Sequence, residues 1–273
     1  MEILLNELSL TGQFKDEDEF FNNFDLVLEI IKLIELLEFS IAKEYMFFDV
    51  AITPKYKLAD FLRLRTDRAK RMKRFLAKLA QHPPFWNEIQ KHNCVNDRYI
   101  FNGIDVCNSS LAESCERDRT VLSFLHHDFL NNNLSIQKNR MNIDIYNIVD
   151  KNNFLEYLLL IAKIEAFSYC KLKFRNSNLN FSKLENEHGF DLLSSKQQEN
   201  EFIDSFKQFS TMSWHDIMSS DGLQYKKYNG TEFKAENIYK FRVTQKYRCF
   251  GYRQEDEFFV LRFEIDHKMS DNG

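Results

Sequence analysis

Basic side chains and a histidine gather in the last part of the chain, in a pattern that suits chemistry on a phosphodiester. Cleaving RNA without a metal ion needs a base for the 2′-OH, cations for the charge that grows on the phosphate, and an acid for the leaving 5′-oxygen. Arg and Lys donate to phosphate oxygens, and histidine is the side chain that changes charge near neutral pH. His267 therefore suits the acid or base role. The cations around it are Lys240, Arg242, Lys246, Arg248, Arg253 and Lys268.

Three short strands are predicted to carry these side chains. Residues 239–244 alternate aromatic or β-branched positions with polar ones, and residues 258–265 alternate in the same way. Period-two alternation with this composition is typical of half-buried strands. Residues 247–253 lie between the two segments, and the connections on either side are short. Short connections between successive strands predict an antiparallel meander.

Three motifs follow one another along these strands. An Arg-bearing strand precedes a second strand that opens with Lys-Tyr-Arg at 246–248, and an apolar strand then ends in Asp-His-Lys at 266–268. This order resembles that of the RelE/ParE superfamily of bacterial toxins. Residues 212–227 look like the end of that fold's lead-in helix and its loop, so the resemblance covers roughly the last 75 residues.

The resemblance implies an α+β protein in which residues 186–273 form a small RelE-like antiparallel-sheet domain. In that family the basic residues act on mRNA, typically in the ribosome, and leave a 2′,3′-cyclic phosphate. It places the Arg of the central strand at Arg248 and the basic end of the last strand at His267 and Lys268. We therefore expect catalytic roles for Arg248, His267, Lys246 and Lys240, and RNA-binding roles for Arg242, Arg253 and Lys268.

The expected function is a metal-independent endoribonuclease, without a cofactor, that acts as a toxin in a toxin–antitoxin system or in phage defence. The family's catalytic Tyr near the C-terminus has no counterpart here, so Tyr247 or Tyr252 would have to replace it. ParE-like relatives share the fold and bind gyrase, so a non-enzymatic interaction protein is the alternative. A third hypothesis is a nuclease with its chemistry near Asp105, Glu113 and Glu116.

Residues 1–185 are predicted to form a helix-rich body with a small sheet that binds a partner, a trigger or the ribosome. Residues 16–39 carry an apolar stripe at helical spacing, and residues 58–81 read as a strongly basic helix with one apolar side. The basic side either contacts RNA phosphates or is solvated or paired with the acidic first helix. Its candidate RNA contacts are Arg68, Arg71 and Arg74.

Composition limits the partners and the compartment. The net charge is −4, so any attraction to nucleic acid has to come from a local patch. The five cysteines lack a CxxC pair, which indicates reduced thiols in the cytoplasm. Apolar stretches fall short of a membrane span, so we expect no membrane contact. The expected partners are RNA, alone or in the ribosome, and an antitoxin or a phage-derived trigger protein.

His126, His127 and Asp128 suggest a metal site. A helix is predicted to run from a cap at Ser109 or Ser110 to about His126. Adjacent histidines on a helix point in different directions, whereas ligands on one helix need a spacing of three or four residues. We therefore expect no metal ion at these residues.

Overall fold

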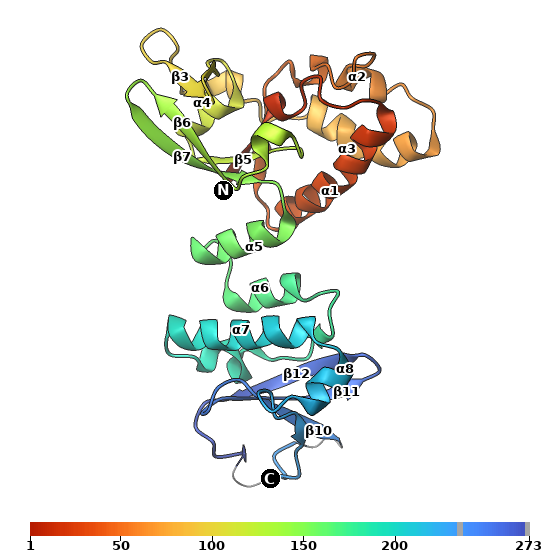
Figure 1. Ribbon diagram of the computed structural model, residues 1–273, viewed down its shortest axis with the longest axis vertical. Coiled ribbons are helices and arrows are strands. Elements are labelled where there is room, and N and C mark those ends of the chain that lie inside the picture. The colour runs from red at the N-terminus through yellow and green to blue at the C-terminus, as the bar shows by residue number, and fades with distance from the viewer. Residues whose placement is uncertain (234–236, 271–273) are drawn as a thin grey trace. The chain divides into compact units, whose positions relative to one another are not determined.

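The structure, a computed structural model, describes residues 1–233 and 237–270 of the 273-residue chain, apart from the side chains at positions 71, 78, 80 and 81. It consists of two compact units, Met1–Phe154 and Leu155–Gly273 (Figure 1). Helices and two mixed sheets fit the α+β class that the sequence predicts. The two units divide after Phe154, whereas the sequence predicts a boundary after residue 185, and residues 179–180 form a strand of the C-terminal sheet.

A seven-stranded mixed sheet is the framework of the N-terminal unit. Its order is β2 (Ser40–Ala42), β1 (Glu2–Leu5), β5 (Thr120–Leu122), β7 (Met141–Ile148), β6 (Asn133–Lys138), β3 (Tyr99–Phe101) and β4 (Ile104–Asp105). The first four strands are parallel, and β6, β3 and β4 continue the sheet with antiparallel pairing. The carboxyl ends of the four parallel strands therefore meet at one edge of the sheet.

The amphipathic helix predicted over residues 16–39 is confirmed as α1 (Glu17–Leu36). It begins at Asp16, whose carboxylate accepts the backbone N–H of Glu19 at 3.0 Å and caps the helix. Its apolar stripe is buried in a cluster of aromatic rings, which is why the helix docks by that side. Members of the cluster are Phe14, Phe20, Phe21, Phe24, Phe61 and Phe124.

Other helices of this unit are shorter than the sequence predicts. Residues 58–81 form two helices, α2 (Leu58–Phe61) and α3 (Asp67–Gln81), because Thr66 starts a new helix by accepting the N–H of Ala69 at 3.2 Å. α4 (Ser110–Cys115) ends well before β5. The 3₁₀ helices of this unit are η1 (Glu7–Ser9), η2 (Phe47–Asp49), η3 (Trp86–Ile89) and η4 (His127–Phe129).

The predicted antiparallel meander is confirmed in the C-terminal unit. Its five-stranded sheet has the order β8 (Leu179–Asn180), β12 (Glu257–Glu264), β11 (Arg248–Gln254), β10 (Ile238–Arg242) and β9 (Lys226–Lys227). β10, β11 and β12 pair with one another in chain order, and β8 adds to β12 in parallel.

One face of this sheet is covered by α7 (Lys196–Thr211). The rings of Phe202 and Phe263 lie 4.2 Å apart, and those of Phe209 and Phe241 lie 4.8 Å apart. The opposite face is turned away from α7 (Figure 1). The remaining helices are α5 (Lys151–Leu160), α6 (Ala166–Lys173), α8 (Trp214–Ser219), η5 (Asn186–His188) and η6 (Phe190–Leu192).

Two of the five cysteines are paired, which corrects the prediction of reduced thiols throughout. Cys94 forms a disulfide with Cys107, with 5.9 Å between their Cα atoms. Val106 donates to the carbonyl of Tyr99, and Asp97 donates to the carbonyl of Asn93, so the chain turns at both cysteines. The other three cysteines are buried thiols. Among the helices of the described residues, none has the length and apolar character of a membrane span.

Candidate functional site

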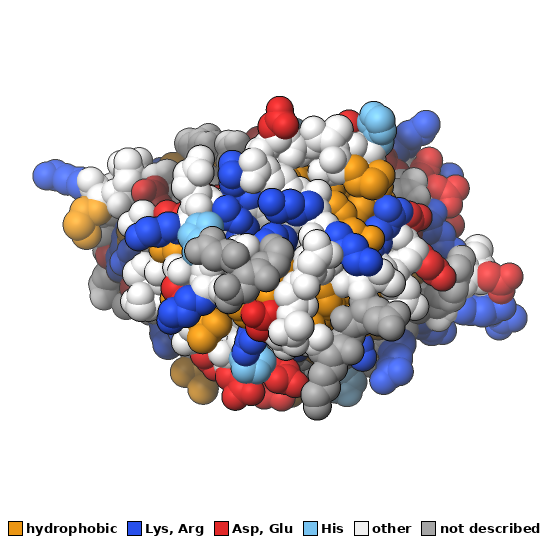
Figure 2. All heavy atoms as spheres, turned by 90° about the horizontal axis from the view of Figure 1, so that it is seen from below, with side chains coloured by type: hydrophobic (Ala, Val, Ile, Leu, Met, Phe, Trp, Pro, Cys, Tyr) orange, Lys and Arg blue, Asp and Glu red, His pale blue; other side chains and the backbone are white. Residues whose placement is uncertain are grey.

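Two rows of mostly charged side chains cross the sheet of the C-terminal unit. Read from β10 to β12, the rows are Arg242–Arg248–Glu264 and Lys240–Phe250–Arg262. Strand residues alternate between faces, and the intervening Phe241 and Phe263 contact α7. The two rows therefore lie on the face turned away from α7. Figure 2, viewed from that side, shows Lys and Arg side chains around the middle of the surface, with hydrophobic side chains between them.

Lys240 and Glu264 are buried on this face and hold the segment after β12. Lys240 is 3% exposed, and its Nζ donates to the carbonyl of Ser270 at 3.0 Å and lies 5.2 Å from the ring of Tyr228. Glu264 accepts the backbone N–H groups of Met269 at 2.6 Å and Ser270 at 2.8 Å. Because the amine of Lys240 is buried, it does not fit the catalytic role predicted for this residue. Lys240 instead anchors the segment after β12.

Arg248 and His267 meet at the turn between β10 and β11. Nη1 of Arg248 donates to the carbonyl oxygens of Thr244 at 2.8 Å and Gln245 at 3.4 Å. Nε2 of His267 donates to the same Gln245 oxygen at 2.9 Å. A carbonyl oxygen only accepts, so Nε2 of His267 carries a proton. These two predicted catalytic residues are therefore close together.

Two further predicted cations lie in this turn or next to His267. Lys246 is exposed within the turn itself. Lys268 is exposed next to His267 and pairs with Asp266 at 2.6 Å. His267 has a φ of +64°, in the left-handed region that costs an L-residue about 1–2 kcal/mol. Its conformation therefore depends on the contacts that hold it, the hydrogen bond to Gln245 among them.

Arg262 and His188 form a second contact between a cation and an imidazole, which the sequence did not predict. Nη2 of Arg262 donates to Nδ1 of His188 at 3.1 Å. Nε2 of His188 lies 3.6 Å from the carboxylate of Glu185 and 3.7 Å from that of Glu187. Arg262 looks like any polar residue of an alternating strand, and His188 lies just after the predicted domain boundary at residue 185. A pattern within the sequence could not have paired them.

Arg253 lies apart from the cations at the β10–β11 turn. Its guanidinium stacks over the ring of Trp214 at 4.0 Å, and Trp214 packs against Phe209 of α7. Arg253 therefore belongs to the α7 side of the sheet. Arg242, in contrast, shares the row of Arg248, and its Nη2 donates to the side chain of Gln224 at 2.6 Å.

The basic helix of the N-terminal unit is partly engaged by α1. Nη2 of Arg68 donates to the carboxylate of Asp25 at 2.8 Å and to the side chain of Asn22 at 2.7 Å. This is the pairing with the acidic first helix that the sequence left open. Arg74 is exposed. The side chain of Arg71 lies outside the described residues.

Two of the three carboxylates of the third hypothesis, Glu113 and Glu116, are held in structural contacts. Glu113 is fully buried, pairs with Nδ1 of His92 at 2.6 Å, and accepts from Nε of Arg117. Burial acts to raise the pKa of Glu113, but the hydrogen bonds from His92 and Arg117 outweigh it and hold the pKa at about 2. Glu116 accepts from Nζ of Lys138 at 2.7 Å. Both carboxylates are committed to these partners, which disfavours a catalytic site built on them.

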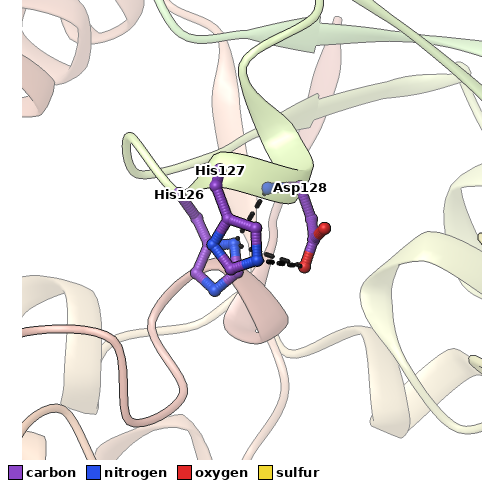
Figure 3. Close-up of side chains that lie close together, drawn as sticks. All are labelled: His126, His127 and Asp128. Carbon is purple, nitrogen blue, oxygen red and sulfur yellow. Dashed lines mark hydrogen bonds and ion pairs between the residues drawn. The ribbon is translucent and has the colours of Figure 1, made fainter.

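His126, His127 and Asp128 lie close together, which corrects the expected divergence of adjacent histidines (Figure 3). The physical reason is that His126 is not helical. Its backbone is extended, with φ −106° and ψ 142°, and it caps η4. The two imidazole rings stack with their centroids 4.2 Å apart. Within the described part of the chain, these residues and the group of Glu185, Glu187 and His188 have the spacing to hold a metal ion.

Comparison of the chain with protein-family models, with curated proteins and with solved structures gives no match. The relation of the C-terminal unit to RelE/ParE toxins stays a prediction from its motifs.

Proposed function

We propose that the C-terminal unit is a metal-independent endoribonuclease that acts as a growth-inhibiting toxin, with its site at the β10–β11 turn. The observation that carries the proposal is the convergence of Arg248 and His267 on the carbonyl oxygen of Gln245. A phosphate oxygen that took the place of this acceptor would meet a guanidinium and an imidazole together. The resemblance of the same turn to the RelE/ParE motif supports the same reaction.

In the proposed reaction His267 moves the protons and Arg248 stabilises charge. Nδ1 of His267 takes the proton of the 2′-OH, the 2′-oxygen bonds to phosphorus, and the bond to the 5′-oxygen breaks. The imidazolium then returns a proton to the 5′-oxygen, which leaves a 2′,3′-cyclic phosphate and a 5′-hydroxyl. Arg248 donates to the phosphate oxygens as their charge grows. Arg242, Lys246 and Lys268 neutralise neighbouring phosphates along the RNA strand.

The N-terminal unit is proposed to bind the partner that directs or controls cleavage in the cytoplasm. Partners of the expected kinds are the ribosome, an antitoxin and a phage-derived trigger protein. The exposed Arg74 of α3 supports a contact with ribosomal or messenger RNA, whereas Arg68 is engaged by α1.

Inducible expression followed by mapping of RNA ends tests the proposal. Wild-type protein should arrest growth and create new RNA ends, and the purified protein, with or without ribosomes, should cut RNA in EDTA. Arg248→Ala and His267→Ala should each abolish cleavage while the protein stays folded by circular dichroism. Arg253→Ala is the matched control, because Arg253 lies on the α7 side of the sheet, and it should cut like wild type. Wild-type cleavage by both site variants would reject the site.

A non-enzymatic binding role is the second candidate, and one observation favours it. Tyr252 and Phe259 are half-buried and stack at 5.0 Å on the same face as the cations. Aromatic side chains beside Arg are typical of the anchoring part of a protein interface. Growth arrest without new RNA ends, and its loss in Tyr252→Ala, would favour this role over cleavage.

A further inference from the structure

The strand order of the N-terminal unit marks one place on its sheet as a site for a ligand. From β1 the chain passes to β2 on one side, and it returns later to β5 on the other side, with all three strands parallel. In sheets with parallel strands, ligands bind beyond the carboxyl ends of the strands where the order reverses in this way. The segment after the carboxyl end of β5 carries His126, His127 and Asp128 within six residues of Leu122.

The distances within this group match those of a tetrahedral metal site. Oδ2 of Asp128 lies 3.2 Å from Nε2 of His127 and 3.6 Å from Nδ1 of His126 (Figure 3). Two ligand atoms bonded to one Zn²⁺ at about 2.0–2.1 Å in tetrahedral geometry are roughly 3.3 Å apart. One potential ligand atom from each residue lies within 4.8 Å of the other two.

The fold holds one of the three side chains firmly and leaves the others adjustable. The side chain of His126 is 12% exposed, and its Nδ1 accepts the backbone N–H of Asp128 at 3.1 Å. His127 is 81% exposed and Asp128 is 43% exposed. The imidazole planes are 26° apart, so the lone pairs of stacked rings run side by side. Rotation of the exposed His127 side chain brings one nitrogen of each ring to the same ion. At Nδ1 of His126 the ion then takes the place of the backbone N–H of Asp128.

We infer that His126, His127 and Asp128 bind one divalent transition-metal ion of the Zn²⁺ class. Imidazole nitrogens with a single carboxylate suit Zn²⁺ and its neighbours, whereas Ca²⁺ and Mg²⁺ need more oxygen ligands. Three protein ligands leave a fourth position for water or a bound molecule, which is the arrangement of reactive rather than structural zinc sites. The inference is independent of the proposed RNA cleavage, since its residues belong to the N-terminal unit and the cleavage needs no metal ion.

Calorimetric titration of the full chain with ZnCl₂, after tag removal and dialysis against a chelator, tests the site. Wild-type protein should bind one Zn²⁺ per chain, and Co²⁺ should give the visible absorption of a tetrahedral site. His126→Ala and Asp128→Asn should weaken the affinity for Zn²⁺ by more than the roughly 10–100-fold that loss of an outer-shell partner costs. Asp128→Asn keeps the size of the side chain, so it remains a test even where His126→Ala does not fold.

Two matched variants complete the experiment. His215→Ala removes an exposed histidine of the C-terminal unit and should bind Zn²⁺ like wild type. His188→Ala removes the imidazole of the other candidate group and should also bind like wild type. Equal affinity of wild type and Asp128→Asn would overturn the inference, and so would loss of binding in His188→Ala alone.

Discussion

Arg248 and His267 share one acceptor, the carbonyl oxygen of Gln245, which lies 3.4 Å from Nη1 of Arg248 and 2.9 Å from Nε2 of His267. The two donors come from different parts of the chain, since Arg248 opens β11, the central strand of the meander, and His267 follows β12. Arg248 is also in register with Glu264 of β12, which anchors the segment that carries His267. The site therefore depends on the sheet register and on this anchor as much as on the two side chains.

Arg248→Lys should slow RNA cleavage even though it keeps the positive charge. Lys is a point charge on a flexible stem, whereas the planar guanidinium of Arg248 presents several N–H donors in a fixed fork that matches phosphate oxygens. Loss of one preorganised donor to a developing oxyanion costs about 10²–10³-fold in rate. Single-turnover cleavage of a labelled RNA in EDTA measures the effect, with Arg253→Lys as the matched control. An unchanged rate would mean that the guanidinium takes no part in the reaction.

Glu264→Ala should lower cleavage without touching either proposed catalytic group. The carboxylate holds the backbone N–H groups of Met269 and Ser270, so its loss frees the segment that carries His267. Glu264 is 4% exposed, and leaving buried hydrogen-bond donors without their acceptor costs about 1–3 kcal/mol. Cleavage rate and thermal unfolding should both fall, whereas Glu255→Ala, in the exposed turn between β11 and β12, should change neither. Full cleavage by Glu264→Ala would separate the anchor from the activity.

Gly251→Ala should disrupt the sheet itself. Gly251 lies at the irregularity between β11 and β12, where a Cβ would collide with the carbonyl oxygen of Phe259 and reach 2.7 Å from the ring of Phe258. Overpacking a buried site typically costs about 1–3 kcal/mol, and a clash with backbone should reach the upper end. Gly222→Ala is the control, because its Cβ would meet only Oγ of Ser220 at 3.6 Å. Thermal unfolding by circular dichroism measures both variants, and equal midpoints would contradict the predicted clash.

Glu7→Gln should remove a pH dependence from the stability of the N-terminal unit. Burial raises the pKa of Glu7 from its ordinary 4.5 to about 7, while hydrogen bonds from Ser110 oppose the rise. The native state therefore keeps a proton that the unfolded state loses, so stability falls as the pH rises from about 4.5 to about 7. The total loss is on the order of 3 kcal/mol.

Urea unfolding of wild type and Glu7→Gln at pH 5 and pH 8 measures this dependence. Gln is neutral at both values, so the variant should lose less stability between them than wild type does. Glu88→Gln changes an exposed carboxylate of the same unit and should keep the wild-type dependence. The same pH dependence in wild type and Glu7→Gln would show that Glu7 does not hold the proton.

The meander could be predicted from sequence because its signals are local. Alternation and short turns decide both the strands and their order, and each strand pairs with the next one along the chain. The parallel strands of the N-terminal unit could not be predicted in the same way, since Leu4 pairs with Val121 across most of that unit. The first strand, β1, ends at Leu5 because the side chain of Asn6 accepts the N–H of Leu8 and caps a 3₁₀ helix.

The candidate site was predictable only in part, for a related reason. A residue of an alternating strand reads as solvated unless another segment covers it. Lys240 is such a residue, and the contacts of Ser270 and Tyr228 that bury its amine cannot be inferred from β10 alone. His188 was hidden by its polar surroundings, whereas its neighbour Phe190 is buried against Phe263 of β12. Long-range contacts of this kind decide which polar side chains remain available to a substrate.

Arg68→Ala should lower stability without changing RNA binding, and Arg74→Ala should weaken RNA binding without changing stability. The side chain of Arg68 is 30% exposed and bonded to Asp25, so its loss should cost about 1 kcal/mol of stability and leave RNA affinity unchanged. Arg74 is exposed, so its loss should spare stability and weaken RNA binding. Each lost phosphate contact should also reduce the slope of log affinity against log salt by about one. Filter binding at several salt concentrations, beside urea unfolding, measures both effects. Weaker RNA binding in Arg68→Ala with unchanged stability would show that the contact with α1 opens when RNA binds.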